Sequence, residues 1–315
     1  MTQIVLIGIG AGAAAALLFA SLASGSSLAI LLVYLCPLPI LIAAIGWNYY
    51  AGAIAALFAT GSLVLVLDGV SVLLFGISFA LPAVWLGYLC LLARPVKGAA
   101  GETLEWYPVG RIVLWIAFLA AAPMVLAILI SFGTDAGNFR STLTDAIEAL
   151  RKSANAVFER EVSVDTGLLA KVLPPMAASA ITIQFLVNTW LAARIVSVSG
   201  QLRRPWPEIP ALTLPRSAPI LLAAALAGIF LPGILGIVSD IFAACLMIAF
   251  TVVGFAVLHV VTRSIGGRPL VLGGVYTAVI IFTWPVIILA LLGLADTALD
   301  LRGRSARTRG PPTPQ

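Results

Sequence analysis

The sequence predicts an all-α fold, a polytopic bundle in which about eight or nine helices cross a membrane. Of the 315 residues, 61% are hydrophobic and only 10% are charged, and the mean hydropathy is +1.11. Soluble domains carry about 25% charged residues, so we expect lipid to be the solvent of this chain. A bilayer core about 30 Å thick needs about 20 mostly apolar residues per helix. Runs such as residues 4–20 are apolar on every face, which excludes the alternating strands of a membrane β-barrel.

Nine apolar runs, separated by polar or turn-forming residues, are expected to cross the bilayer. They are Ile4–Ala23, Leu28–Ile45, Ala51–Leu67, Val70–Leu92, Val109–Phe132, Leu168–Val196, Pro219–Val238, Ile241–Val261 and Leu270–Leu294. Ser239 and Asp240 are expected to separate the seventh run from the eighth, and Pro285 interrupts the last. No basic residue precedes the first run, so we expect a retained helix rather than a signal peptide.

Polar residues divide the chain into four segments. These are an N-terminal five-helix membrane region (1–132), a polar amphipathic insert (133–167), a C-terminal membrane region (168–301) and a basic tail that we expect to be disordered (302–315). The first region ends with a polar loop around Arg94 and Glu105 before its fifth helix. In the insert, apolar residues recur at helical spacing on one stripe: Leu143, Ile147, Leu150, Ala154 and Val157. This pattern predicts an amphipathic helix on the membrane or over the mouth of the bundle, with a solvated connector as the alternative.

Basic residues between the runs bear on orientation. With nine spans the 18 basic residues divide equally between the two sides, and with eight spans one side has a clear excess. Four arginines (Arg194, Arg203, Arg204 and Arg216) flank the sixth and seventh runs. We therefore expect their loop to face the cytoplasm of a bacterial cell whose inner membrane holds the chain.

Several kinds of chemistry are not expected. The net charge of +5 is spread over loops, so the sequence predicts headgroup contacts and no nucleic-acid interface. Cys36, Cys90 and Cys245 lie far apart in apolar runs and predict neither disulfides nor a metal site. His259 is the only histidine, and neither a nucleophile nor an orienting partner is recognisable near it. We expect no cofactor, no catalytic residues and no enzyme activity.

The sixth run carries the most polar residues and is the candidate ligand cavity. Gln184 and Asn188 lie one helical turn apart, and Thr182 and Ser179 lie nearby in the sequence. Polar residues at membrane depth are costly and often functional. Hydrogen bonding between helices is the alternative role for such amides.

The first run carries a stripe of small residues. Gly8, Gly12, Ala16 and Ala20 repeat every four residues, a pattern that lets two helices approach closely. Packing inside the bundle and docking to a partner membrane protein are both open for this stripe.

Charged residues follow the last run. Asp296 and Asp300 share one helical face, and acids at a helix C-terminus oppose the macrodipole. We expect interfacial ion pairs in which Arg302 serves one acid and Arg268 or Arg263 also contacts Asp296. Solvated carboxylates are the alternative.

Four short stretches together resemble the YybS-type family of predicted bacterial membrane proteins. They are Pro37-Leu38-Pro39 with Gly52, the loop from Arg203 to Pro207 with Leu214-Pro215, the stretch from Gly254 to His259, and the stretch from Leu292 to Asp296 with Asp300 and Arg302. The resemblance covers nearly the whole chain. It implies a distant similarity to the substrate-binding subunits of energy-coupling-factor transporters, and it transfers no binding residue.

These observations favour a multi-pass membrane protein that binds or transports a small molecule, in the manner of a substrate-binding subunit. A structural or scaffolding protein of the bacterial cell envelope is the alternative. The sequence contains no nucleotide-binding loop, so active transport would draw its energy from another protein.

Overall fold

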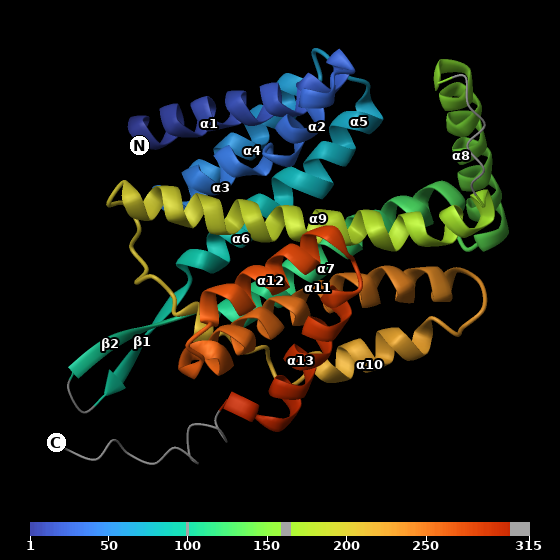
Figure 1. Cartoon of the computed structure of the whole chain (residues 1–315). Helices are drawn as coiled ribbons and strands as arrows, with labels where there is room; N and C mark the ends of the chain where they lie inside the picture. The colour runs from blue at the N-terminus through green and yellow to red at the C-terminus, as the bar shows by residue number, and fades with distance from the viewer. Residues whose placement is uncertain (99–100, 159–164, 303–315) are drawn as a thin grey trace. The chain divides into compact units, whose positions relative to one another are not determined.

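The computed structural model describes residues 1–98, 101–158 and 165–302, and helices dominate it (Figure 1). Within these residues, six helical stretches are long and apolar enough to cross a bilayer. They are Thr2–Ser24, Ser27–Gly46, Gly69–Leu91, Val109–Phe132, Thr166–Val198 and Ile234–Val261. The chain is therefore a multi-pass membrane protein whose membrane-spanning elements are helical, as predicted.

The structure does not show the eight or nine spans that the sequence predicts. Four further apolar helices are shorter: α4 (Tyr49–Leu63), α10 (Ala218–Gly228), α12 (Arg268–Ile281) and α13 (Pro285–Leu299). At 1.5 Å per residue, the 15 residues of α4 extend about 22 Å and the 11 residues of α10 about 16 Å. Both lengths fall short of the about 30 Å apolar core.

One predicted helix boundary, at Ser239 and Asp240, is wrong, whereas the predicted interruption at Pro285 is present. Ser239 and Asp240 do not separate two helices but lie inside α11 (Ile234–Val261). The break falls earlier, at Pro232 and Gly233, where Gly233 has φ = 73°. Proline cannot continue the hydrogen-bonding pattern of a helix, and only glycine adopts positive φ without strain. The last apolar run is likewise two helices, because α12 ends before Pro285 opens α13.

The described residues form two compact units that cut across the linear segments of the sequence. Of the described residues, the first unit contains those within 1–119 and 182–213, and the second contains 120–158, 165–181 and 214–302. Helices α7 (Val109–Phe132) and α9 (Thr166–Val198) each contribute residues to both units. Contacts between residues distant in sequence therefore define the units.

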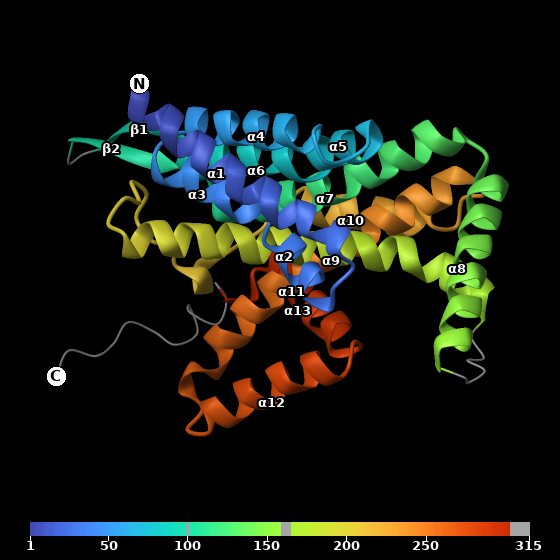
Figure 2. The same ribbon diagram turned by 90° about the horizontal axis from the view of Figure 1, so that it is seen from above.

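The first unit is built around α1 (Thr2–Ala20) and α4, which lie side by side (Figures 1 and 2). Its other elements are η1 (Ser21–Ser24), α2 (Ser27–Tyr34), α3 (Pro37–Gly46), α5 (Gly69–Phe75), a π-helical turn η2 (Gly76–Ala80), α6 (Leu81–Leu91) and the parts of α7 and α9 named above. Asp68 caps α5 by accepting hydrogen bonds from the backbone N–H groups of Val70 and Ser71, both at 3.0 Å. Hydrogen bonds from Ser71 lower the pKa of the Asp68 carboxyl.

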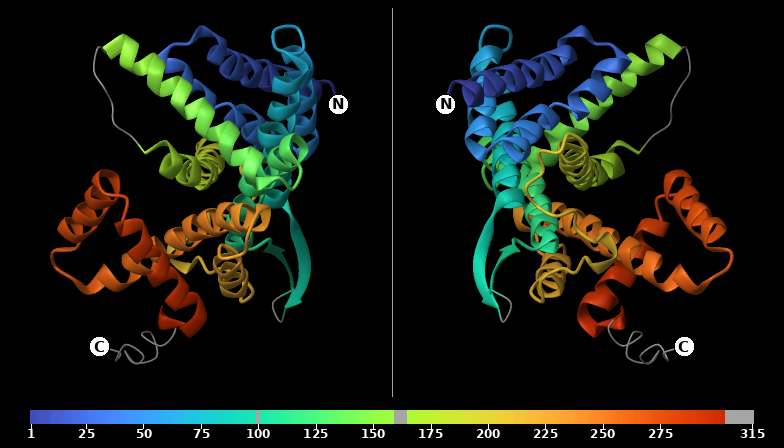
Figure 3. Two further views of the ribbon diagram at one scale, coloured as in Figure 1. Left: turned by 90° about the vertical axis from the view of Figure 1, so that its right-hand side faces the viewer. Right: turned by 90° about the vertical axis from the view of Figure 1, so that its left-hand side faces the viewer.

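A β-hairpin follows α6 where the sequence predicts a polar loop. Strands β1 (Ala93–Gly98) and β2 (Gly101–Trp106) pair antiparallel and project from the end of α6 (Figure 3). The register places Arg94 opposite Glu105, and their side chains form a 2.7 Å ion pair. Opposite charges across the strands favour this pairing over an irregular loop.

The second unit centres on the close approach of α11 and α13. It also holds α8 (Ala136–Phe158), α10, η4 (Thr262–Ser264) and α12, while η3 (Ile209–Ala211) belongs to the first unit. Gly254 on α11 lies against the backbone of Leu289, and Gly293 on α13 lies against the backbone of Phe250. Two stretches that carry the family resemblance thus meet here, because glycine lets the helix backbones touch.

Helix α8 confirms the expectation of a helical insert but differs in detail. Asp135 directly precedes the helix, and its carboxylate accepts a 2.9 Å hydrogen bond from the N–H of Asn138 in the first turn. Ile147 is buried and Leu150 is 71% exposed, so the apolar stripe is only partly covered. Glu148 pairs with Arg151 at 2.6 Å, and this hydrogen-bonded pair lowers the pKa of the Glu148 carboxyl. The side chains of Ala154 and Val157 lie outside the described residues, as does the tail beyond Arg302.

Candidate functional site

The candidate site begins with a break in the second membrane-crossing stretch. Helix α2 ends at Tyr34 and α3 begins at Pro37, near the middle of the 20-residue stretch. Pro37 has no N–H to donate to the carbonyl of Val33, four residues earlier. The Val33 carbonyl instead accepts from the N–H of Cys36 at 3.1 Å, and the N–H of Leu38 donates to Leu35 at 3.0 Å, so no helical N–H is left for the Tyr34 carbonyl. The break therefore leaves the Tyr34 carbonyl without a backbone donor inside an apolar stretch, where such an acceptor requires one.

Two amides of α9 supply these donors. The Gln184 side-chain Nε2 donates to the Val33 carbonyl at 3.2 Å and to the Tyr34 carbonyl at 3.1 Å. Asn188 Nδ2 donates to the Tyr34 carbonyl at 2.8 Å and to the Gln184 carbonyl at 2.8 Å. Both side chains are almost fully buried. The amides therefore stabilise the broken helix, as donors between helices commonly do.

The same hydrogen bonds leave an acceptor of Asn188 unused. Because Nδ2 faces two carbonyl oxygens, the amide can take only one orientation. Its Oδ1 atom is buried and has no hydrogen-bond partner among the described residues. A buried acceptor without a donor costs free energy. A ligand N–H or O–H that donated to Oδ1 would therefore contribute favourably to the binding free energy.

Asn188 lines a cavity of about 410 Å³ between α2 and α9 in the first unit. It is lined by Ser27, Ile30, Leu31, Tyr34, Leu35, Ile183, Gln184, Val187 and Asn188. The apolar wall is exposed: Ile30 is 61%, Ile183 45% and Val187 46% accessible. The volume is within the range of small-molecule sites. Apolar walls with few polar groups suit an amphipathic ligand.

The other two residues predicted for the cavity do not line it. Thr182 is buried elsewhere in the first unit, and Ser179 belongs to the second unit. Helix geometry explains the difference, because each residue turns the helix by about 100°. Gln184 and Asn188 point to one face, whereas Thr182 lies about 200° away from Gln184. The carbonyls that Gln184 contacts lie at the end of α2, directly before the break at Pro37.

The small-residue stripe of α1 is used inside the bundle. A Cβ atom at Gly8 would lie 2.7 Å from Ile54 Cγ2, and one at Gly12 would lie 2.5 Å from the Ala55 carbonyl oxygen. Ala16 is also buried, and Ala20 is half-buried. The stripe therefore packs against α4.

Of the terminal ion pairs expected from the sequence, the structure shows the one in which Arg302 serves an acid. Asp296 is 4% exposed and accepts hydrogen bonds from Arg302 Nε at 2.9 Å, from its Nη2 at 2.7 Å and from its backbone N–H at 3.1 Å. Among the described residues, neither Arg263 nor Arg268 forms a salt bridge with Asp296. Arg302 reaches the Asp296 carboxylate because Asp300, with φ = 50°, reverses the chain direction after α13. Arg268 Nε is buried without a partner in the same described part.

Metal ligands are not clustered in the described parts of the chain, where no three His, Cys, Asp or Glu residues could hold one ion. His259 Nδ1 lies 2.9 Å from the carbonyl oxygen of Phe255 on its own helix. The His259 ring is therefore held against the backbone of its own helix, one turn earlier.

Comparison with known proteins agrees with the membrane character of the fold. No curated protein and no solved structure matches the chain. One family model, described as "Predicted membrane protein (DUF2232)", matches residues 13–297, which include both glycines of the α11–α13 contact and the cavity between α2 and α9. Because the match spans most of the chain, this protein belongs to the DUF2232 family of predicted membrane proteins.

Proposed function

We propose that the chain binds a small amphipathic molecule within the bilayer, in the cavity between α2 and α9. The observation that carries the proposal is Asn188, which lines the cavity of about 410 Å³ and whose buried Oδ1 has no hydrogen-bond partner among the described residues. The exposed apolar walls favour a ligand with a hydrocarbon or ring body. One hydroxyl or amine donor on that body would complete the hydrogen bonding of Asn188.

Transport of this ligand is the larger role that we propose. Membrane transporters commonly place their substrate sites at broken helices, where backbone outside a regular helix lines a cavity. The α2–α3 break has this arrangement. The proposal places the chain in a bacterial inner membrane and gives it the role of a substrate-binding subunit. It assigns no catalytic step to the chain.

A partner protein would supply the energy, since the sequence has no nucleotide-binding loop. The stripe of Gly8 and Gly12 is packed against α4, so the partner would contact the opposite face of α1. That face includes Leu6 and Leu17, which are 65% and 73% exposed.

A structural role in the cell envelope is the second candidate. The observation in its favour is that the side-chain amides of Gln184 and Asn188 donate to backbone carbonyls of the described residues. In that case the amides act only to hold α2 and α9 together, and the cavity contains lipid chains.

The test is native mass spectrometry of the purified full-length protein, with identification of small molecules that co-purify. Ile183→Trp fills the cavity, and Ile195→Trp is the matched control, because Ile195 lies on the same helix, is 39% exposed and does not line the cavity. We expect a bound molecule in the wild type and the control, and its loss from Ile183→Trp. Equal occupancy in both variants, or only bilayer lipid in the wild type, would contradict the proposal.

A further inference from the structure

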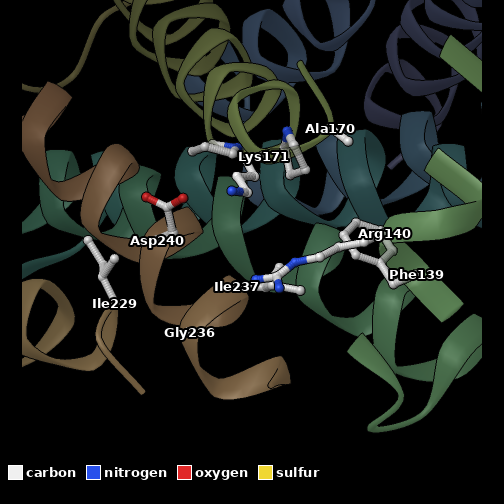
Figure 4. Close-up of a pocket in the computed structure, with 10 residues that line it drawn as sticks. Phe139, Arg140, Ala170, Lys171, Ile229, Gly236, Ile237 and Asp240 are labelled. Carbon is white, nitrogen blue, oxygen red and sulfur yellow. The ribbon is translucent and has the colours of Figure 1, made fainter. Parts of the chain in front are cut away.

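A second cavity, of about 190 Å³, lies in the second unit and carries charges of both signs (Figure 4). Arg140 comes from α8, Lys171 from α9 and Asp240 from α11. Figure 4 shows the three side chains reaching toward the same space from their separate helices. The rest of the lining is mainly apolar and includes Phe139, Pro174 and Ile237.

The three charges do not neutralise one another. Among the described residues, no carboxylate oxygen lies within 4.0 Å of a charged nitrogen of Arg140 or Lys171, and none of the salt bridges involves Asp240. Asp240 is half-buried, and both cations are exposed at the cavity. The cavity therefore has a positive part and a negative part, each open to a ligand. An ionised group on a membrane helix costs free energy and is usually paired. No side chain among the described residues pairs with these three groups.

We infer that this cavity binds a phosphoethanolamine group, with the phosphate at Arg140 and Lys171 and the primary ammonium at Asp240. Guanidinium and ammonium groups are strong donors to phosphate oxygens. The Asp240 carboxylate accepts hydrogen bonds but donates none when ionised, so it selects an ammonium that carries N–H groups. A quaternary choline ammonium has no such donor, and a glycerol headgroup has no positive charge.

The position of the cavity fits the headgroup of an aminophospholipid. Arg140, Lys171 and Asp240 all lie in the second turn of their helices, so the three helices begin near the cavity. The ends of membrane-crossing helices lie at the level of lipid headgroups. The apolar side of the cavity, with Phe139 and Ile237, suits the glycerol and first methylene groups of the same lipid.

The experiment titrates the purified full-length protein with lipids and counts bound lipids by native mass spectrometry. Phosphatidylethanolamine, phosphatidylcholine and phosphatidylglycerol with identical acyl chains are the three probes. We expect phosphatidylethanolamine to bind about threefold to tenfold more tightly than the other two, as expected for one additional partly exposed ion pair. Soluble glycerophosphoethanolamine, added as a competitor, distinguishes the two sources of the group. Displacement at comparable concentration indicates a soluble ligand, and failure to displace indicates the lipid.

Two matched pairs of variants locate the binding. Asp240→Asn should abolish the preference for phosphatidylethanolamine over phosphatidylglycerol, whereas Asp240→Glu and the control Asp145→Asn, on the exposed surface of α8, should retain it. Lys171→Gln should weaken the binding of both phosphatidylethanolamine and phosphatidylglycerol. Lys152 lies outside the cavity, so Lys152→Gln should weaken the binding of neither lipid.

Equal binding of the three lipids by the wild type, or a preference that survives Asp240→Asn, overturns the inference. Melting curves establish that each variant is folded, and the lysine pair decides the question if Asp240→Asn does not fold. Ile183→Trp fills the cavity of the first unit and should leave this lipid preference unchanged. Failure of the proposed function and failure of this inference are therefore distinguishable.

Discussion

Arg302 reaches Asp296 because a single residue between them adopts the left-handed conformation. Asp300 follows the last residue of α13 with φ = 50° and ψ = 53°, a conformation that aspartate tolerates better than most residues. Its N–H donates to the Asp296 carbonyl at 2.8 Å. The chain then reverses and brings a cation to the negative end of the helix dipole. The sequence indicated that the acids need a cation, but the choice of Arg302 depends on this turn.

Asp296→Asn is expected to destabilise the protein. The side chains of Asp296 and Arg302 are 3% and 12% exposed, so removing one charge leaves the other buried and unpaired. The expected loss is about 2–4 kcal/mol of unfolding free energy, seen as a lower melting temperature. The control is Arg94→Ala on the hairpin, where the arginine side chain is 76% exposed and the expected loss is below about 1 kcal/mol. Equal melting of the two variants would show that the Asp296 pair is not a stabilising contact.

Gly12→Leu tests the close approach of α1 and α4. A Cβ at Gly12 already meets the Ala55 carbonyl, so a leucine must push the two backbones apart. Gly10→Leu is the matched control on the same helix, because nothing lies within 4 Å of its Cβ position. We expect Gly12→Leu to lower the melting temperature by several degrees, as overpacking that costs about 1–3 kcal/mol does, and Gly10→Leu to leave it nearly unchanged. Similar curves for both variants would mean that α4 does not constrain α1.

At the scale of elements, the apolar runs and the interruption at Pro285 were predictable, whereas the break at Pro232 and Gly233 and the hairpin were not. A run of apolar residues predicts a helix that can lie in lipid. The transfer of its side chains from water to lipid is favourable whichever helix packs beside it. The break at Pro232 and Gly233 had a local signal that hydropathy outweighed, since both residues lie inside a long apolar run. The hairpin had its signal in two basic residues followed by two acidic ones, Arg94 and Lys97 and then Glu102 and Glu105, which face each other only when the strands pair.

The α2–α3 break predicts an energetic coupling between Pro37 and Gln184. Gln184→Leu removes the donor to the Val33 and Tyr34 carbonyls and should cost about 1–2 kcal/mol. Pro37→Ala supplies a second backbone N–H for the Val33 carbonyl, which already accepts from Cys36 at 3.1 Å, so the same Gln184→Leu change should cost somewhat less in that background. Melting temperatures of the single and double variants measure the coupling.

Pro39→Ala is the matched control for this cycle. Its new N–H would serve the Leu35 carbonyl, which already accepts from Leu38 and which Gln184 does not contact. Pro39→Ala should therefore not reduce the cost of Gln184→Leu. The same reduction from both alanine variants would mean that the amide does not act on the carbonyl freed by Pro37.

At the scale of the whole molecule, the sequence predicted segments along the chain and the structure has units made of distant pieces. The candidate cavity illustrates the difference, because residues 27–35 and 183–188 line it together. Periodicity placed Gln184 and Asn188 on one face, but nothing in the sequence paired that face with α2. The choice of neighbour depends on which helix offers free carbonyls, and this follows from packing across more than 150 residues.

The contacts within the first unit also predict which loops share a side of the membrane. Gly8 lies against Ala51 and Ile54, and Gly12 lies against Ala55 and Phe58, so α1 and α4 run parallel. Helix α4 therefore accompanies α1 and is expected to cross the bilayer, although it has only 15 residues. Arg203 donates to the Trp47 carbonyl at 3.3 Å, which places the arginine loop beside the start of α4.

Cysteine labelling in intact cells tests this arrangement. In a background with Cys36, Cys90 and Cys245 replaced by alanine, single cysteines are placed at Gln201, Ser26 and Leu65, which are all exposed. The loop of Gln201 is rich in arginine, so we expect it in the cytoplasm and protected from a membrane-impermeant thiol reagent. Ser26 follows the end of α1 and Leu65 follows the end of α4, so both should be labelled. Labelling of Gln201 alone would reverse the orientation but leave the crossing intact, because α1 and α4 would still end on the same side. If Leu65 behaves like Gln201 while Ser26 differs from both, α4 does not cross, and the parallel packing of α4 on α1 is wrong.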